Sequence, residues 1–215
     1  MGEGAGSAPI RVLRILSRLN FGGPSLHVLA LTNGLRTLGF ETILAIGTPR
    51  PCEGSMTPHA RQQNIEPHII PGLDRPVRLV PDSLAFFHLW NLIREFRPHI
   101  VHTHTSKAGI LGRLAAWSLR VPVILHTFHG HVFSGYFSPA ISTAIVALER
   151  FLAKCTSAFI ALSPQLRVDL LHFLRLSRPE KIRVIPLGIP LETFFRTPRK
   201  EGQFRREFQI SPDAH

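Results

Sequence analysis

The sequence predicts an α/β fold in which a parallel sheet of about seven strands carries helices on both faces. Short apolar segments, typical of buried parallel strands, alternate with longer segments whose apolar residues recur with a helical period. This alternation continues along most of the 215 residues without an internal repeat, and strand–helix–strand units pack as parallel sheets. Hydrophobic residues make up 44% of the chain, which is enough for one sizeable core.

Seven segments have the short, apolar composition expected of the strands. In order, they are Arg11–Ser17, Glu41–Gly47, Pro67–Ile70, His99–Thr103, Pro122–Phe128, Ser157–Ser163 and Lys181–Ile189. The third segment has the weakest signal, because it lies within residues 48–81, a stretch rich in Pro and Gly that otherwise favours loop.

Apolar periodicity and end signals predict the helices between these strands. The expected helices are Leu26–Leu38, Leu84–Phe96, Lys107–Leu119, Pro139–Lys154, Pro164–Leu174 and a short polar one within Thr197–Phe208. Gly39 is a typical C-terminal cap for the first helix, and Asp82 or Ser83 can cap the second at its N-terminus. Pro98 then ends the second helix.

Composition and charge exclude several classes of protein. The chain has 25 Lys and Arg against 14 Asp and Glu, a net charge of +11 that favours an anionic partner. Because the arginines are spread and no nucleic-acid motif occurs, we expect no nucleic-acid partner. Cys52 and Cys155 cannot form a disulfide framework, and no apolar run suits a membrane span or a signal peptide. These features predict a reduced, cytoplasmic protein.

A glycine pair follows the first expected strand. Ligands of parallel sheets bind beyond the carboxyl ends of the strands, and Gly22 and Gly23 lie at such an end, directly before a helix. Glycines allow close approach of the backbone, and a helix N-terminus suits a phosphate. The spacing is neither that of a dinucleotide-binding loop nor that of a P-loop, so a plain tight turn is the alternative.

Twelve histidines raise the question of a metal site. Because no C-x-x-C or H-E-x-x-H motif accompanies them, we expect no metal. His102 and His104 are expected to point to opposite faces of their strand, and His102 and His126 to bond to backbone in the core. His129 precedes Gly130 in a turn at the carboxyl edge, where an imidazole can bind a hydroxyl or phosphate or exchange a proton. A histidine that only braces the loop is the alternative.

Five segments between about Arg11 and Phe194, in collinear order, resemble the N-terminal half of family 4 glycosyltransferases, which are retaining enzymes of the two-domain GT-B fold. They are NFGGPSLH, IVHTHTSKAGILGRLAAW, HTFHGHVFSGYFS, AFIALSPQ and KIRVIPLGIPLETF. The resemblance implies a Rossmann-like domain of an enzyme that moves a sugar from a nucleotide diphosphate sugar to an acceptor hydroxyl with retention. It also implies a role in cell-envelope polysaccharide or glycolipid synthesis.

The resemblance assigns roles to individual residues. His129 is implied as the catalytic residue, and Gly22, Gly23 and Gly130 as binding the donor diphosphate and sugar. The residues implied to face the acceptor are Thr105, Ser106, Lys107 and His131. Pro186 and Gly188 match a hinge, although Pro190 stands where the family has Asp. His27 and Ser163 also match, with packing and helix capping as their alternatives.

No carboxylate in the sequence is an obvious nucleophile. The candidates, which we expect to be loop, cap or surface residues, are Asp74, Asp82, Glu95 and Glu149. This fits a transfer in which the donor phosphate itself takes the proton of the acceptor, as the resemblance also implies. Because the sequence has no D-x-D pair, no metal or other cofactor is expected.

The expected organisation is that of half an enzyme. We predict a flexible tail at residues 1–10, the acceptor-side domain at 11–190, and at 191–215 a hinge and the start of a linker. The second, nucleotide-sugar-binding domain of the family is missing from this sequence, so the chain is expected to be inactive alone. The alternatives are a non-catalytic module that binds a nucleotide or sugar phosphate, and a fragment of a GT-B sugar-nucleotide epimerase.

Two segments predict a membrane-proximal acceptor. One is a basic and apolar loop around Arg75 and Arg78 that includes Leu73, Val77, Leu79 and Val80. The other is the aromatic stretch 132–137. Basic residues are attracted to anionic lipid, so we expect a sugar or lipid-linked acceptor and peripheral contact at the inner face of a membrane. Apolar side chains tucked onto the domain are the alternative.

Overall fold

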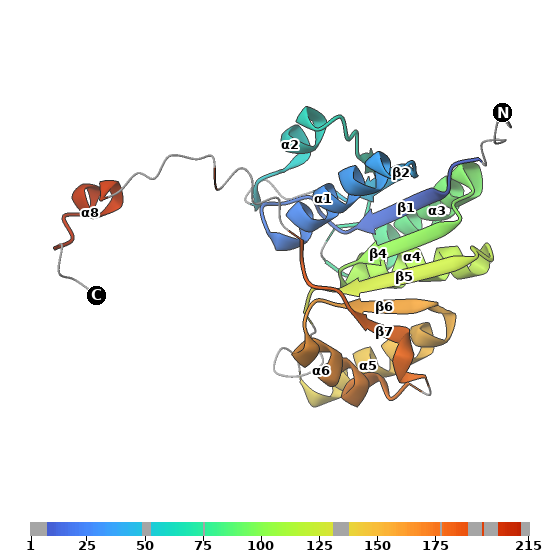
Figure 1. The fold of residues 1–215 in the computed structure, drawn as a ribbon. Coiled ribbons are helices and arrows are strands. Elements are labelled where there is room, and N and C mark those ends of the chain that lie inside the picture. The colour runs from blue at the N-terminus through green and yellow to red at the C-terminus, as the bar shows by residue number, and fades with distance from the viewer. Residues whose placement is uncertain are drawn as a thin grey trace, which may run out of the picture.

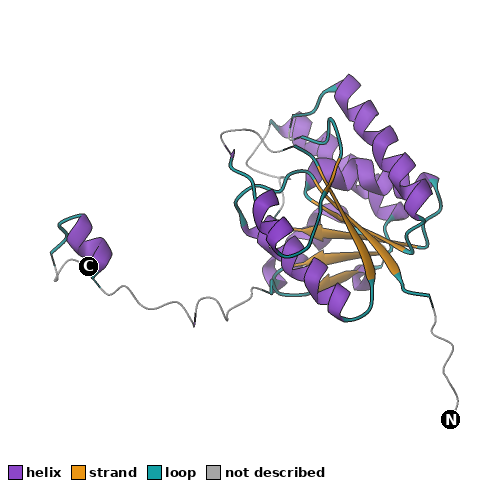
Figure 2. Cartoon of the chain, turned by 90° about the horizontal axis from the view of Figure 1, so that it is seen from above, coloured by secondary structure: helices purple, strands orange, loops and turns teal. Residues whose placement is uncertain are grey.

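The computed structural model describes residues 8–48, 53–74, 76–130, 138–176, 178–188, 195 and 202–211. Within them, seven parallel strands form one sheet in the order β3-β2-β1-β4-β5-β6-β7, with helices on both faces (Figure 1, Figure 2). The strands are β1 (Arg11–Leu16), β2 (Glu41–Ile46), β3 (His68–Ile69), β4 (Ile100–His104), β5 (Val123–Phe128), β6 (Ala158–Ala161) and β7 (Ile182–Val184). The predicted fold class is therefore confirmed.

The helices follow the predicted segments with two differences. They are α1 (Gly23–Thr37), α2 (Thr57–Gln62), α3 (Leu79–Phe96), α4 (Ser106–Ser118), α5 (Pro139–Cys155), α6 (Pro164–Leu174) and α8 (Gln203–Glu207), with a 3-10 turn at Pro179–Lys181. The helix α2 lies where only loop was predicted. The helix α3 begins before Asp82, whose carboxylate reaches back from the first turn to accept the amide hydrogen of Arg78 at 3.1 Å. None of the described helices is long and apolar enough to cross a membrane.

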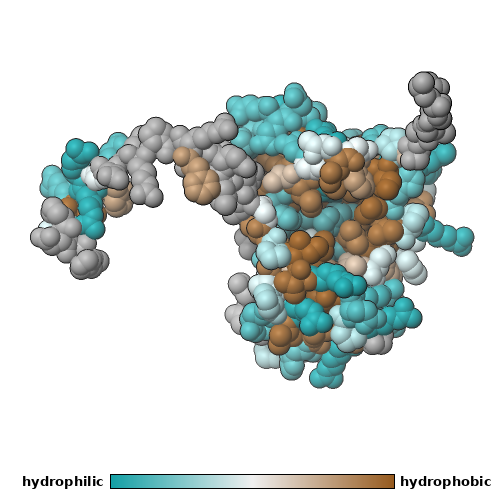
Figure 3. Space-filling view, in the orientation of Figure 1, coloured by the Kyte–Doolittle hydropathy of each residue, from teal (hydrophilic) through white to brown (hydrophobic). Residues whose placement is uncertain are grey.

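Strand β1 divides the core between the two faces of the sheet. Leu13 and Ile15 belong to the apolar cluster that includes residues of α3 and α4. Leu16 packs on the other face with Val28 of α1. Figure 1 looks onto this α1 side, where no helix among the described residues covers the strands from β4 to β7, and Figure 3 shows apolar side chains gathered on the same face.

The strand order reverses between β1 and β4, which are neighbours in the sheet although two other strands separate them in sequence. Leu16 and His104, the last residues of these strands, lie side by side. Ligands of open α/β sheets bind at such a reversal, beyond the carboxyl ends of the strands. The fold therefore brings the loops after β1, β4 and the adjacent β5 to one edge.

Candidate functional site

The glycine pair forms the start of α1 and faces open space. Gly22 precedes the helix in an extended conformation, and Gly23 is the first helical residue. A Cβ atom on Gly23 meets no other atom within 4 Å, and one on Gly22 meets only the Cδ of Pro24 at 3.9 Å. The backbone at this helix N-terminus is thus open to close approach by a ligand.

His129 lies directly beyond β5 at the same edge. Its ring is half-buried, and its Nε2 lies 3.1 Å from Nδ1 of His104. Gly130 follows with φ of 144°, a conformation that L side chains rarely adopt, and a Cβ atom on it meets nothing within 4 Å. The His-Gly pair therefore presents an imidazole beside an open stretch of backbone.

The rings of four histidines from three elements pack together. The histidine cluster consists of His27 on α1, His102 and His104 on β4, and His129 after β5. The ring centroid of His27 lies 5.6 Å from that of His129 and 6.0 Å from that of His104. His27 thereby joins the glycine turn of α1 to the end of β5. His27 therefore packs against other rings, as the alternative role expects, and one of these rings is that of the candidate site residue His129.

The orientation predicted for the β4 histidines is wrong. His102 and His104 lie on the same face, with ring centroids 4.3 Å apart, because residues two positions apart on a strand share a face. The backbone partner predicted for His102 is replaced by a hydroxyl group, whereas His126 bonds to both the backbone and the hydroxyl of Thr103. His102 Nε2 lies 2.8 Å from the hydroxyl of Thr127, and on the other face His126 Nδ1 lies 2.8 Å from the hydroxyl of Thr103.

The histidine cluster is neutral near pH 7. Burial, followed by the charge of His27, lowers the pKa of His129 from 6.5 to about 4. Burial, followed by the charge of Arg14, lowers the pKa of His102 to about 3. The Arg14 side chain is itself fully buried, and its Nη1 donates to the hydroxyl of Thr32 at 2.8 Å. The rings therefore act as hydrogen-bonding groups rather than as charges.

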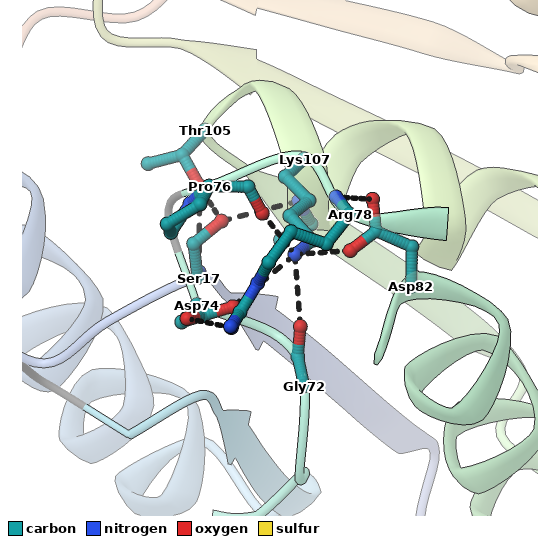
Figure 4. A network of polar contacts seen from close by, with 9 residues as sticks. Ser17, Gly72, Asp74, Pro76, Arg78, Asp82, Thr105 and Lys107 are labelled. Atoms are coloured by element: carbon teal, nitrogen blue, oxygen red, sulfur yellow. Dashed lines mark hydrogen bonds and ion pairs between the residues drawn. The ribbon is translucent and has the colours of Figure 1, made fainter. Parts of the chain in front are cut away.

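The loop after β4 is fastened to the end of β1. Thr105 has φ of 63°, which is strained for a β-branched residue, and its hydroxyl lies 2.8 Å from that of Ser17 (Figure 4). The Ser17 hydroxyl also accepts the amide hydrogen of Ala108 at 3.1 Å, so a residue that follows β1 caps α4. Ser106 is exposed at this turn.

Lys107 differs most from its implied role. It is buried, and its Nζ donates to the carbonyl oxygens of Gly72 at 2.8 Å and Pro76 at 2.7 Å (Figure 4). The same ammonium group forms ion pairs with Asp74 and Asp82. Lys107 therefore binds the loop before α3 to the start of α4, and its donors are used inside the chain rather than facing an acceptor.

The remaining candidates have different outcomes. Ser163 caps α6 by accepting the amide hydrogen of Leu166 at 3.1 Å, and Glu95 is exposed as expected. Glu149, expected at the surface, is instead buried in an ion pair with Arg113. The hinge residues Pro186 and Gly188 are exposed beyond β7. Cys52, Arg75, His131, residues 132–137 and Pro190 lie outside the described residues.

No group of three or more His, Cys, Asp or Glu side chains within the described ranges could hold a metal ion. Sequence reasoning did not single out Arg14 or Ser17 as parts of the site. The two-residue spacing of His102 and His104 on one strand was the available signal for the cluster.

Comparisons with known proteins identify a family and relatives that this chain resembles. The model of glycosyltransferase family 4 matches residues 21–193. A UDP-Gal:alpha-D-GlcNAc-diphosphoundecaprenol alpha-1,3-galactosyltransferase from Escherichia coli is 37% identical over 131 residues, which are 61% of this chain and 34% of that protein. The chain thus spans about a third of the length of this relative.

Solved structures share the fold at low identity. Anabaena Alr3699/HepE, in complex with UDP and glucose, matches with a TM-score of 0.69 and 17% identity over 93% of this chain and 50% of that one. The UDP-GlcNAc 2-epimerase from Neisseria meningitidis, bound to UDP-GlcNAc, matches with a TM-score of 0.63 and 17% identity over 95% of this chain and 54% of that one.

Proposed function

Because the chain belongs to glycosyltransferase family 4, we propose that it is the acceptor-side lobe of an enzyme that moves a sugar from a nucleotide diphosphate sugar to an acceptor hydroxyl with retention. The Escherichia coli relative is named for transfer from a UDP-sugar to a sugar on a lipid diphosphate, which supports a glycolipid or polysaccharide product. Since this chain spans only part of its relatives, the activity belongs to the whole protein.

The observation that carries the proposal is the meeting of the glycine turn and His129 at one edge, joined by the ring of His27. The donor diphosphate lies over Gly22 and Gly23, where open backbone amides and the helix dipole stabilise negative charge. His129 and Gly130 border the donor sugar. The acceptor approaches from the loop of Thr105 and Ser106.

The proposed reaction balances without a protein nucleophile. The bond between the sugar carbon and the phosphate oxygen breaks while the acceptor oxygen bonds to the same face of that carbon. The acceptor proton passes to the leaving phosphate oxygen. In support, three of the candidate carboxylates are committed to structural ion pairs; these are Asp74, Asp82 and Glu149. The proposal needs no metal or other cofactor.

Replacing His129 tests the assignment in a complete enzyme. The chain is fused to a C-terminal nucleotide-sugar domain of a family 4 enzyme, and transfer of labelled sugar to an acceptor is measured. We expect His129→Ala to lower kcat by about 100-fold, the usual effect of losing one positioned hydrogen-bonding group. His68→Ala, at an exposed position of the edge strand β3, is the matched control and keeps full activity.

Two outcomes contradict the proposal. Unchanged turnover of His129→Ala removes this residue from the site. Binding of nucleotide sugars by the fusion without any transfer favours the non-catalytic module instead. An epimerase converts the donor without an acceptor, so product analysis separates that alternative. The epimerase structure is similar in fold alone, whereas the family match covers residues 21–193.

A membrane-bound acceptor is the second part of the proposal. Three apolar side chains in the first half of α3 are exposed rather than tucked onto the domain: Leu79 by 85%, Val80 by 69% and Phe87 by 59%. Leu73, predicted as part of this surface, is instead fully buried in the core. Arg78 lies beside the exposed side chains, so the surface combines apolar and basic groups as anionic lipid requires.

Vesicle binding tests this surface. We expect the chain to co-sediment with vesicles that contain anionic lipid at low salt, and less with zwitterionic vesicles or at high salt. Val80→Ser/Phe87→Ser should weaken binding by roughly tenfold or more, because burial of each side chain contributes on the order of 1.5–3 kcal/mol. Leu38→Ser, at an equally exposed apolar position after α1, is the control. Equal binding by both variants contradicts the assignment.

A further inference from the structure

The chemistry of a neutral His129 depends on which ring nitrogen carries the proton. Its Nε2 lies 3.1 Å from Nδ1 of His104, so one of these two nitrogens donates and the other accepts. If His104 donates, the remaining nitrogen of His129 is an Nδ1–H donor. If His129 donates, its Nδ1 is a bare acceptor.

The burial of His104 favours one of these arrangements. His104 has no exposed surface, and its Nε2 has no partner within the described parts of the chain. If a neutral His104 accepted a hydrogen bond at Nδ1, its own hydrogen would lie on Nε2. That hydrogen would then be a buried N–H without a partner. Buried N–H groups without a partner are rarer in proteins than buried acceptors without one. The proton of His104 therefore belongs on Nδ1.

A buried cation lies next to the cluster, because Arg14 of β1 pairs in register with His102 of β4. Its guanidinium is fully buried beside the cluster, and its Nε and Nη2 have no partner in the described residues. The charged and titratable groups that act on His104 are Arg14, His27, His102 and His129. Arg14 is the one cation among these groups, and its unpartnered N–H groups favour a lone pair on any ring nitrogen that faces them.

We propose that His104 is a positioning residue that fixes the proton of His129. Its Nδ1–H donates to Nε2 of His129, and His129 presents Nδ1–H beyond β5 as a hydrogen-bond donor. Such a donor binds an acceptor oxygen of a sugar hydroxyl or a phosphate, and it does not take a proton from the acceptor substrate. The identity of that oxygen rests on the proposed function, whereas the position of the proton does not.

Nitrogen-15 NMR of the 215-residue chain near neutral pH measures the position of the proton directly. Long-range couplings between ring carbon-bound hydrogens and ring nitrogens distinguish the two neutral forms of histidine, and His129→Gln assigns the signals of His129. We expect a single form of His129 with the hydrogen on Nδ1. A hydrogen on Nε2 in the wild-type chain overturns the proposal, whatever the activity of the enzyme.

Two substitutions at His104 test whether this residue fixes the position of the proton on His129. His104→Asn keeps an amide N–H near the place of Nδ1, and we expect His129 to remain in the Nδ1–H form. His104→Leu removes the donor, and we expect the Nε2–H form of His129 to become the major one. His126→Asn alters a buried histidine on the other face of the sheet and leaves His129 unchanged.

The outcomes remain distinct if one variant is unstable. If His104→Leu does not fold, the wild-type and His104→Asn spectra still decide where the proton lies. If His104→Leu folds and His129 keeps its Nδ1 hydrogen, His104 does not fix it and the proposal fails. Because no donor sugar is present in these experiments, a failure of the glycosyl-transfer assay does not affect them.

Discussion

The free energy of unfolding of the chain is expected to fall steeply as the pH is lowered from about 6.5 towards 5. Five histidines in the described residues have pKa values below the ordinary 6.5 in the folded chain, and burial is the largest cause for each. They are His27, His102, His104, His126 and His129. An acid-sensitive fold follows from this concentration of neutral, buried rings.

The sign of this change in stability follows from the number of protons that each state binds. The unfolded chain protonates these rings near pH 6.5, whereas folded His129 does so near pH 4 and His102 near pH 3. Between these values the unfolded state binds more protons, so stability is lost as the pH falls. One pH unit below 6.5, a ring that is protonated only in the unfolded state destabilises the fold by about 1.4 kcal/mol. The sum is on the order of several kcal/mol, against a typical total of about 5–15 kcal/mol.

Urea unfolding at fixed ionic strength between about pH 7.5 and about pH 5 measures the slope, which counts the protons taken up. His102→Gln replaces a titrating ring with a neutral amide that can still bond to Thr127, so we expect about one proton fewer. His68→Gln, at an exposed position, is the control and leaves the slope unchanged. A flat profile across this window contradicts the prediction.

The fold could be predicted because its signals are local. Short apolar strands and periodic helices can each be recognised from their own segment of sequence, and their alternation predicts a parallel sheet. The helix α2 has no such period: it buries only Ala60, and it was therefore missed. The early start of α3 was missed because the side chains of Leu79 and Val80 are exposed and do not continue the apolar period of the helix.

The candidate site could be predicted only in part. His129 follows β5 directly, and Gly22 and Gly23 lie where the loop after β1 enters α1, so their place at the carboxyl edge follows from the order of elements. The contact of His27 with His129 depends on how α1 packs over the sheet, which no local pattern encodes. The contacts of Lys107 could not be predicted for the same reason, since the carbonyl groups that its Nζ binds lie more than 30 residues away, in the loop before α3.

The second large effect concerns the buried ion pair between Arg113 and Glu149, a carboxylate that the sequence placed among loop, cap or surface residues. Arg113 is completely buried, and its Nη2 lies 2.8 Å from both carboxylate oxygens of Glu149. Its Nε donates to the carbonyl oxygen of Gly109 at 2.8 Å. We expect Arg113→Met or Glu149→Leu alone to lower the free energy of unfolding by about 3–5 kcal/mol, because each leaves a buried charge without its partner.

The double variant Arg113→Met/Glu149→Leu is expected to regain most of this loss, because it removes both charges and fills their space with apolar groups. Urea unfolding of the three variants measures the recovery. Glu66→Gln is the matched control: it breaks the exposed pair with Arg61 and should leave the unfolding midpoint nearly unchanged. If the double variant is as unstable as the sum of the single ones, the pair is not the source of the loss.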